Sequence, residues 1–444
     1  MGLFGKKSPY GELILLTLLG FYFFVFGNWF LAITSPDEGK NSYAALHMLT
    51  TGDWIIPYYN CHYRFEKPPL LYWLMALSFK IFGINEFAAR LPSGLAALGT
   101  SITTYFLVRD FLSREKAFVG ASVFLLLLHT WVESRAAVPE MVLVFFSTLG
   151  VYLLLKEKPL WGWLSLALAF LAKGPVGVVL PLAVVFIFRL LKGEGFIPTL
   201  RWFLKLFNPL GVLLFILVGG FWYLLVLYKV GWEFFYKFFI LENIARFTGK
   251  LHRHLYPFWY YIPVVLAASL LFLPAVLLNF KKLFSKRVAP FGGWFLFVFL
   301  FYSASKGKLH HYMLFAYPAL AGVLSNILSI RYIRNAYIAG FLLLSLLLGF
   351  AYYYNTERFV PKAVSYLKGE NPKHLYFYGI EDSAIVFYLN RCIPQIKDLS
   401  EAPKGSYVIT SAGDLKGIKV PYEVLVRGKE LKRKEVLIRL RGND

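Results

Sequence analysis

The first 354 residues are a succession of long apolar runs, and this pattern constrains the fold more than any other feature of the chain. A helix needs about 20 consecutive apolar residues to cross a bilayer. Hydrophobic residues make up 58% of the chain and aromatic residues 19%, far above the range of soluble globular domains. Runs bounded by charges or by glycine and proline predict about eleven transmembrane helices, at residues 11–33, 87–108, 117–132, 138–155, 159–172, 174–190, 206–228, 257–279, 291–304, 309–328 and 334–354. The sequence therefore predicts an all-α polytopic membrane protein.

The basic loops indicate how the chain is oriented. Short cytoplasmic loops carry an excess of Lys and Arg, and all the short basic loops fall on one side if the N-terminus is cytoplasmic. They contain Lys6, Lys7, Arg109, Arg114, Lys116, Lys156, Lys158, residues 189–205 and 281–287, Arg331 and Arg334. Segment 68–83 is short for a span, and as a span it would move every later basic loop outside, so we expect it to lie in the interface. These patterns predict a multi-pass protein of the inner membrane with its C-terminal tail in the periplasm.

The tail differs in composition from the rest, because its charge density rises and long apolar runs disappear. Short β-type segments at Leu375–Tyr378, Tyr407–Thr410 and Val436–Leu440 predict a small α/β domain. We therefore divide the chain into a membrane domain, 1–354, whose first outer loop is 34–86, and a periplasmic domain, 355–444. Both cysteines, Cys61 and Cys392, fall on the outer side, where a disulfide is permitted, but their spacing does not indicate whether they pair.

The net charge of +22 does not indicate a nucleic-acid partner. The cations are divided among cytoplasmic loops, outer loops and the tail rather than forming one patch. Topology explains the first group, and anionic lipid headgroups would explain the rest. We expect membrane lipids and no nucleic acid as partners, and a monomer.

Two acidic positions on the predicted outer face are candidates for chemistry. Asp37 and Glu38 follow the first span in the run Ser35-Pro36-Asp37-Glu38, which also fits a capping box with Ser35 as the N-cap and Glu38 three residues later. The box explains Glu38 and leaves Asp37 less explained. Glu140 opens the fourth span at the same depth, where it is either a functional acid or an acid favoured by the helix dipole.

Cations gather on the same face as these acids. Glu66 and Lys67 precede the interfacial segment, and the outer loop after the seventh span carries Glu242, Arg246, Lys250 and Arg253. The turn before the tenth span reads SASKGKLHHY and contains Lys306, Lys308 and Tyr312. The positive-inside rule does not account for these cations, whereas binding of an anion at the bilayer surface does. An isolated lysine here would simply extend to water.

Histidines on this face offer a further possibility. His252, His254, His310 and His311, with Glu66 nearby, have donor atoms that suit a divalent metal ion. Their spacing matches no recognised metal pattern, and polar loop histidines are the alternative. The metal therefore stays open at this stage.

Longer motifs resemble a known family. The runs SPDEGKNSYAALHMLTTGDWIIPYY and RFEKPPLLYWLMALSFKIFGINEFAARLPS resemble the first outer loop of the bacterial lipid A 4-amino-4-deoxy-L-arabinose transferase family and of its protein mannosyltransferase relatives. LAKGPVGVVLP, FFILENIARFTG, PFWYYIP and SASKGKLHHYML follow in the family's order, so that the resemblance covers roughly residues 10–320. The tail is similar only through LYFYGIEDSAIVFYLNR.

The resemblance implies a GT-C fold and transfer, with inversion, of a sugar from a polyprenyl phosphate to an acceptor at the outer membrane surface. It places the catalytic acid at Asp37 and a second acid at Glu140. It places phosphate contacts at Lys67, Arg246 and Tyr312, with Lys306 or Lys308 as helpers. The remaining substrate-binding candidates are Glu38, Lys40 and Glu66. Cations neutralise the phosphate leaving group, and Asp37 would deprotonate a hydroxyl acceptor.

Departures from the family pattern leave the substrates open. Lys40, Asn41 and Tyr43 stand where many relatives have Arg, Tyr and a second Glu, and Asn243 stands where relatives often have His. The donor sugar is therefore aminoarabinose, galacturonic acid or a hexose, and the acceptor is lipid A, a core sugar or another group. The alternatives are a protein O-mannosyltransferase-type enzyme with a Ser/Thr acceptor, a lipid-binding protein without catalysis, and a lipid-linked sugar transporter. A transporter usually places its site near the midplane between repeated halves, and the sequence has no such repeat.

Overall fold

The structure is a computed structural model that describes residues 10–245, 248–249, 254–431 and 433–441. The chain forms two compact units. Unit 1 comprises Met1–Phe26, Phe65–Leu71 and Arg90–Leu344, and unit 2 comprises Gly27–Arg64, Tyr72–Ala89 and Ser345–Asp444. The chain passes from one unit to the other within helices α3 (Leu70–Phe82), α4 (Glu86–Phe111) and α18 (Ile330–Glu357).

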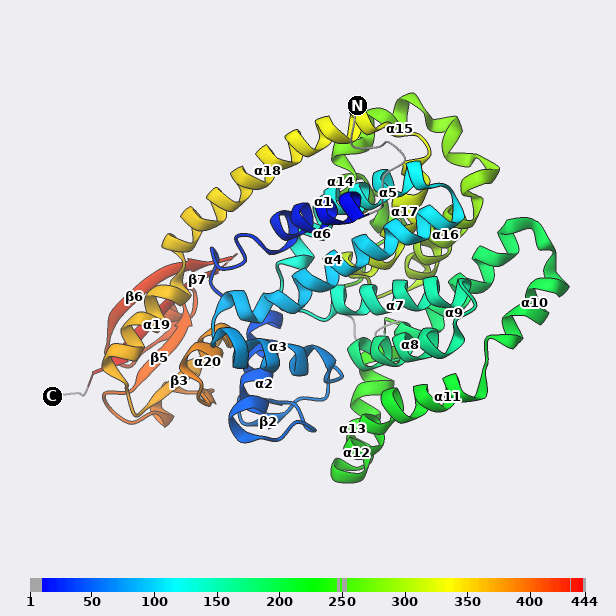
Figure 1. Ribbon diagram of the computed structural model, residues 1–444. Helices are drawn as coiled ribbons and strands as arrows, with labels where there is room; N and C mark the ends of the chain where they lie inside the picture. Colours follow the sequence, from blue (N-terminus) through cyan, green and yellow to red (C-terminus); the bar gives the residue numbers. More distant parts are fainter. Residues whose placement is uncertain (1–9, 246–247, 250–253, 432, 442–444) are drawn as a thin grey trace. The chain divides into compact units, whose positions relative to one another are not determined.

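The secondary-structure elements of unit 1 are helices in its described residues (Figure 1). Its helices are α1 (Tyr10–Gly20), η1 (Phe21–Val25), α5 (Arg114–Leu126), α6 (Leu128–Ser134), α7 (Glu140–Leu155), α8 (Pro159–Lys173), α9 (Val176–Arg189), η2 (Leu190–Glu194), α10 (Phe196–Lys205), α11 (Pro209–Phe215), η3 (Ile216–Gly220), α12 (Phe221–Val230), α13 (Trp232–Phe235), η4 (Tyr236–Ala245), η5 (Phe258–Tyr260), α14 (Tyr261–Ala268), η6 (Leu270–Phe272), α15 (Leu273–Leu278), η7 (Phe280–Phe284), η8 (Lys286–Val288), α16 (Ala289–Ala304), η9 (His310–Ala316) and α17 (Tyr317–Ser325).

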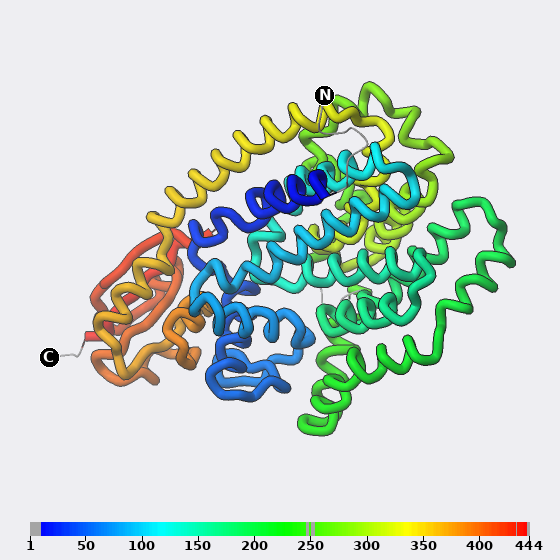
Figure 2. Tube along the Cα trace, viewed as in Figure 1, coloured from blue at the N-terminus to red at the C-terminus, as the bar shows by residue number. Residues whose placement is uncertain are grey.

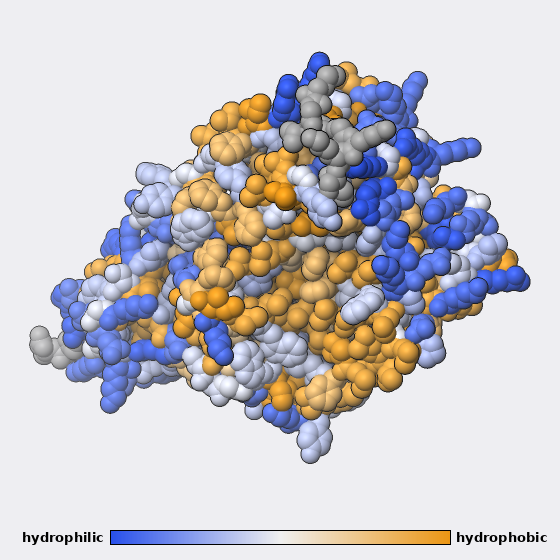
Figure 3. All heavy atoms as spheres, in the orientation of Figure 1, coloured by the Kyte–Doolittle hydropathy of each residue, from blue (hydrophilic) through white to orange (hydrophobic). Residues whose placement is uncertain are grey.

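Several of these helices have the length and composition of membrane spans. Among the described residues, five qualify: Glu86–Phe111, Val176–Glu194, Pro209–Val230, Lys286–Ala304 and Ile330–Glu357. Two bent pairs, Arg114–Leu126 with Leu128–Ser134 and Phe258–Ala268 with Leu270–Leu278, raise the number to seven if each pair is one span. The multi-pass architecture is confirmed, while the count of about eleven spans stays a prediction. Leucines such as Leu210, Leu213 and Leu224 are exposed, as is typical of helices that face lipid. Figure 3 shows a broad apolar surface in orange.

Small residues bring α7 and α8 close together. A Cβ atom on Gly162 of α8 would lie 2.6 Å from Cδ2 of Leu154 on α7, and one on Gly150 of α7 would lie 2.7 Å from Cδ2 of Leu166 on α8. Glycine at such positions allows helices to approach closely where a membrane supplies no hydrophobic driving force. Figure 2 shows α7, α8 and α9 running side by side. The hairpin therefore brings the first residue of α7 next to the last residue of α8.

Unit 2 contains the sheet. Helix α2 (Asp37–Thr51) and the hairpin β1 (Tyr58–Tyr59) with β2 (His62–Tyr63) come from the first outer loop. The tail supplies α19 (Phe359–Glu370), β3 (Leu375–Tyr378), α20 (Ser383–Leu389), β4 (Gln395–Ile396), η10 (Leu399–Glu401), β5 (Tyr407–Ser411), η11 (Asp414–Gly417), β6 (Tyr422–Glu430) and β7 (Arg433–Leu440). The strand order is β4-β3-β5-β7-β6, with β3 parallel to β4 and β5, and β7 antiparallel to β5 and β6. The predicted small α/β tail is confirmed, and its three expected strands correspond to β3, β5 and β7.

A disulfide and a buried ion pair hold the loop and tail segments of unit 2 together. Cys61 and Cys392 form a disulfide with a Cα–Cα distance of 5.6 Å, which answers the question that their spacing left open. Arg358 is fully buried, and its Nη1 and Nη2 donate to the carbonyl oxygens of Ala32 and Ile33 at 2.6 Å and 3.0 Å. Its Nε donates to Oε1 of Glu430 at 2.9 Å. The tail therefore satisfies backbone carbonyls at the start of the outer loop.

Candidate functional site

The α7–α8 hairpin creates a buried ion pair in unit 1. Glu140 is the first residue of α7, only 3% exposed, and Lys173 is the last residue of α8. The ammonium Nζ of Lys173 donates to Oε1 of Glu140 at 2.7 Å. The other carboxylate oxygen of Glu140, Oε2, is buried and has no hydrogen-bond partner among the described residues. A buried acceptor in this state carries a desolvation cost that a ligand donor would remove.

A third element, η9, completes this cluster. Nε2 of His311 lies 3.3 Å from the same Oε1 of Glu140. The ammonium of Lys173 also lies over the ring of Tyr312, 5.2 Å from its centroid. The predicted residues Glu140 and Tyr312, far apart in sequence, therefore both contact one lysine. Such contacts fix a long, flexible side chain in one direction.

Lys173 faces a pocket of about 700 Å³, a volume that includes its open mouth. The pocket is lined by Glu66, Lys67, Pro68, Lys173, Val176, Phe238, Glu242, Asn243, Phe301, Tyr302, Ser305, Gly307 and Tyr312. Two ammonium groups, two carboxylates and two phenols thus share the space with aromatic and aliphatic walls. Lysines bind phosphate as point charges, carboxylates accept hydrogen bonds from hydroxyl or amino groups, and the apolar walls suit a hydrocarbon chain.

The remaining cations that were predicted for this face behave differently. From the turn before η9, the described lining of the pocket includes Ser305 and Gly307 but neither Lys306 nor Lys308. Lys306 is exposed, whereas Lys308 is buried and donates to the carbonyl oxygen of Ser305. Arg246 and His252 lie outside the described residues, so the predicted arginine contact stays a prediction.

The candidates of the first outer loop belong to unit 2. Asp37 is the exposed first residue of α2. Glu38 is buried, and its Oε2 accepts hydrogen bonds from the backbone nitrogen and Oγ1 of Thr34 at 3.0 Å and 2.7 Å. The ammonium of Lys40 lies 5.4 Å from the ring centroid of Tyr59. Glu38 therefore ties the start of α2 to the preceding chain, whereas Asp37 projects from that helix start.

The capping box predicted with Ser35 as the N-cap does not form. Pro36, not Ser35, occupies the cap position, and it makes no side-chain cap bond. The hydroxyl of Ser35 instead donates to Oδ1 of Asp382 at 2.7 Å. Asp382 also caps α20, because Oδ1 accepts from the backbone nitrogens of Ala384 and Ile385. The Ser35 hydroxyl thus bonds to a residue of the tail instead of capping α2.

Lys173 is the site residue that the motif analysis did not single out. Its signal was present, because it is the lone charge between the predicted spans 159–172 and 174–190 and lies on their predicted outer side. An isolated lysine at a helix end is usually interpreted as a side chain that reaches water. The partner that contradicts this interpretation, Glu140, lies 33 residues earlier in sequence.

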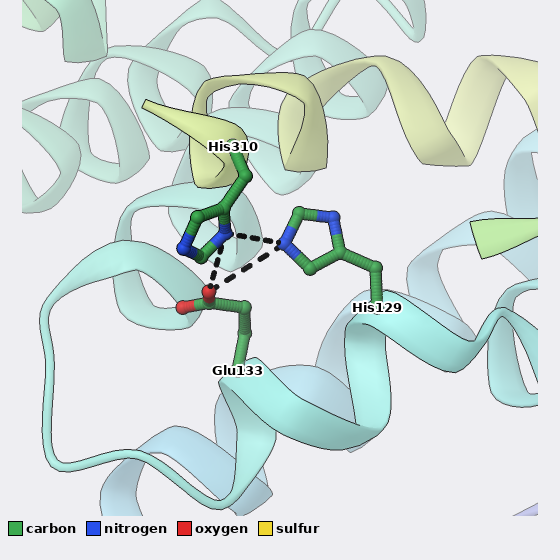
Figure 4. Close-up of side chains that lie close together, drawn as sticks. All are labelled: His129, Glu133 and His310. Carbon is green, nitrogen blue, oxygen red and sulfur yellow. Dashed lines mark hydrogen bonds and ion pairs between the residues drawn. The ribbon is translucent and has the colours of Figure 1, made fainter. Parts of the chain in front are cut away.

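A second polar cluster in unit 1 consists of His129, Glu133 and His310 (Figure 4). Of the predicted metal-ligand histidines that the structure describes, only His310 joins it, because His311 contacts Glu140 and His254 lies outside the cluster. The predicted metal site of loop histidines with Glu66 does not form among the described residues. The cluster that does form joins His310 to two residues of α6.

Unit 2 also has a buried acid cluster. Glu435, Asp382 and Glu430 are all buried, and Arg358 pairs with Glu430. Burial raises the pKa of Asp382 and of Glu430. Burial, together with the neighbouring charge of Asp382, raises the pKa of Glu435 to about 8. These carboxyl groups lie in the core of a small domain, and they resist ionisation because the ionised form would lose its hydration.

Comparisons of the sequence with known proteins give consistent matches. Residues 66–219 match the family described as dolichyl-phosphate-mannose-protein mannosyltransferase. An uncharacterized protein of Aquifex aeolicus is 54% identical over 97% of this chain and 99% of its own length. An undecaprenyl phosphate-alpha-4-amino-4-deoxy-L-arabinose arabinosyl transferase of Shewanella sediminis is 31% identical over 66% of this chain. The chain covers only 55% of that transferase's length.

Solved structures share the fold. ArnT from Cupriavidus metallidurans, bound to undecaprenyl phosphate, superimposes with a TM-score of 0.76 over 97% of this chain and 98% of its own, at 18% identity. The oligosaccharyltransferase AglB from Archaeoglobus fulgidus gives a TM-score of 0.57 over 93% of this chain and 70% of its own, at 13% identity. At these identities the likeness concerns the fold.

Proposed function

Because the chain belongs to the GT-C family of polyprenyl-phosphate-sugar-dependent glycosyltransferases, we propose that it moves a sugar, with inversion, from a polyprenyl phosphate to lipid A, a core sugar or another acceptor. The observation that carries this proposal is the pocket in which Lys67 and Lys173 stand beside apolar walls. A polyprenyl phosphate has this combination of an anionic head and a hydrocarbon tail.

The lysines supply the chemistry that the donor requires. The bond that breaks joins the anomeric carbon of the sugar to a phosphate oxygen, and the phosphate leaves with an additional negative charge. Preorganised cations stabilise that developing charge more in the transition state than in the ground state. Lys67, Lys173 and Tyr312 would hold the phosphate, with Arg246 as a further contact and Lys306 and Lys308 as helpers outside the described lining.

The acids take separate roles in this proposal. Asp37, exposed at the start of α2, would accept the proton of a hydroxyl acceptor as the general base. Glu140 would act as a positioning residue, because its Oε1 holds Lys173, while its unpartnered Oε2 would accept a hydrogen bond from the substrate. Glu38 and Lys40 would support the first turns of α2 that present Asp37.

The pocket also bears on the donor sugar. An amino sugar would pair its ammonium with Glu66 or Glu242, whereas a uronic acid would add a negative charge beside them. The lining therefore favours aminoarabinose over galacturonic acid, and the arabinosyl transferase relatives act on that amino sugar, as their name states. The second candidate function is transfer to a Ser/Thr hydroxyl, which the match to the protein mannosyltransferase family favours.

We further propose that the enzyme is a monomer of the inner membrane whose active site and tail face the periplasm. The Cys61–Cys392 disulfide supports this side, because such bonds persist in oxidising compartments. A reporter fused after Asp444 should be active outside the cytoplasm.

The test of the function is direct. Purified full-length protein is incubated with radiolabelled polyprenyl-phosphate sugars and with lipid A or a Ser/Thr peptide, and the label is followed by chromatography. We expect transfer from an amino-sugar donor that is lost in Asp37→Asn and kept in Asp398→Asn, an exposed aspartate of the tail. Transfer by Asp37→Asn at the wild-type rate would exclude Asp37 as the base. Absence of transfer from every donor, with polyprenyl phosphate still bound, would point to an untested acceptor or to a lipid-binding role without catalysis.

A further inference from the structure

The cluster of His129, Glu133 and His310 has the arrangement of a metal site (Figure 4). His129 and Glu133 are four residues apart on α6, so both side chains leave the same face of that helix, and His310 approaches from the first turn of η9. Nε2 of His129 lies 3.0 Å from Nδ1 of His310. Oε1 of Glu133 lies 3.5 Å from Nε2 of His129 and 3.3 Å from Nδ1 of His310.

We propose that these three side chains bind a divalent transition-metal ion, with Zn²⁺ preferred. Ligand atoms that stand about 2 Å from a tetrahedral ion lie roughly 3.3 Å from one another, and the three observed separations, 3.0, 3.3 and 3.5 Å, bracket that value. One point close to the plane of the three atoms is therefore about 2 Å from each of them. Three protein ligands leave a fourth position for water.

The donor set selects the ion. Two imidazole nitrogens and one carboxylate oxygen suit Zn²⁺ and its neighbours in the first transition row, whereas Mg²⁺ and Ca²⁺ prefer oxygen ligands. The side chain of Glu133 is 5% exposed, whereas that of His310 is 52% exposed. An ion from solvent can therefore reach the site on the side of His310.

An outer hydrogen bond orients the first ligand. Nδ1 of His129 lies 2.8 Å from Oη of the fully buried Tyr317. When Nδ1 carries the proton and donates to this oxygen, the lone pair of Nε2 points to the ion position. Metal-bound histidines typically make such a bond with their second nitrogen.

The ion would link α6 to η9, and the residues that follow His310 on η9 belong to the site proposed for catalysis. His310 directly precedes His311, which contacts Glu140, and Tyr312, which lines the pocket. A metal bond from α6 would hold the first turn of η9 in place, and with it these two side chains. The site is thus distinct from the phosphate-binding pocket, and its existence does not depend on the proposed reaction.

The experiment measures metal binding by the full-length protein in detergent, after removal of metals with a chelator. Co²⁺ is titrated as a spectroscopic probe, since tetrahedral coordination gives it intense visible absorption, and Zn²⁺ is then added in competition. We expect saturation at about one ion per chain, displacement by Zn²⁺, and a weaker apparent affinity by at least about tenfold in His310→Ala and Glu133→Gln. Tyr317→Phe should weaken binding by about tenfold, because the outer hydrogen bond is lost. His374→Ala removes an exposed histidine of unit 2 and should bind as the wild type does.

Two results would overturn the proposal. One is a wild-type protein that shows no tetrahedral Co²⁺ spectrum, which would mean that the two imidazoles and the carboxylate share protons instead of a metal. The other is retention of full affinity in both His310→Ala and Glu133→Gln, which would place the ion elsewhere. If one variant fails to fold, as judged by gel filtration, the other variant and the wild-type spectrum decide.

Discussion

Each unit buries an ion pair, and the two pairs have different neighbours. In unit 1, Glu140 and Lys173 pair beside an open pocket, and one carboxylate oxygen lacks a partner among the described residues. In unit 2, Arg358 pairs with Glu430 and donates to two backbone carbonyls, and the nearby Glu435 resists ionisation because it is buried. Burial of a charged pair therefore does not by itself indicate a functional site. The Glu140–Lys173 pair is the one that we propose for substrate contact, because Lys173 shares its pocket with Lys67 and Tyr312.

The largest effect on stability should come from breaking the buried Arg358–Glu430 pair. Arg358→Met leaves Glu430 without its partner and two carbonyl oxygens without donors, so the free energy of unfolding of unit 2 should fall by about 3–5 kcal/mol. Amide hydrogen exchange of β5 and β7 in the full-length protein measures this loss. Arg441→Met is the matched control, because its ion pair with Glu423 is exposed, and it should cost less than about 1 kcal/mol. Equal protection in the two variants would contradict the contrast between the clusters.

The Glu140–Lys173 pair should control activity rather than stability. Lys173→Met removes one cation from the pocket, and kcat/KM for sugar transfer should fall about 10²–10³-fold, as is typical when a preorganised electrostatic contact is lost. Lys229→Met, at an exposed position of α12, is the control and should leave transfer unchanged. Tight binding of polyprenyl phosphate to Lys173→Met, with normal transfer, would remove Lys173 from the proposed site.

The buried acid cluster of unit 2 should also make stability depend on pH, and the sign follows from the raised pKa of Glu435. The folded protein keeps this proton up to about pH 8, whereas the unfolded chain releases it near 4.5. The contribution to stability is therefore complete below pH 4.5 and declines, by at most about 1.4 kcal/mol per pH unit, until pH 8. Thermal unfolding of the wild type across this window should show the decline, and Glu435→Gln should flatten it. A variant with the same slope as the wild type would assign the pH dependence to another group.

The smallest effect is expected at Lys306, which is exposed and lies outside the described lining of the pocket. Lys306→Met should reduce transfer by less than about fivefold, because exposed charge contacts are screened by water and salt. Raising the salt concentration should reduce the difference further. A loss as large as that of Lys173→Met would move Lys306 into the phosphate contact and would favour a different arrangement of the turn before η9.

Sequence patterns predicted the features that depend on neighbouring residues. The strands β3, β5 and β7 follow from alternation of apolar residues, and Glu140 was found because an acid at the first position of an apolar helix is conspicuous. Ser35 was assigned to a cap by its neighbours, yet its partner Asp382 lies 347 residues away. The Lys173–Glu140 and His129–His310 contacts were missed for the same reason. Each depends on which helices pack together, and the sequence pattern does not specify that. The i, i+4 spacing of His129 and Glu133 was the one local sign of the second cluster.

The disulfide between Cys61 and Cys392 has a consequence for membrane insertion. The two sulfurs meet in one compartment although 331 residues separate them. The chain must therefore cross the bilayer an even number of times between them. The five long spans and the two bent pairs all follow Cys61 and give seven crossings when each pair spans once. An odd number of shorter helices, such as α7 and α8 with a third segment, must then cross as well. A single covalent bond thus excludes every topology with an odd number of crossings between the two cysteines, and it can close only after the last of these segments has been inserted.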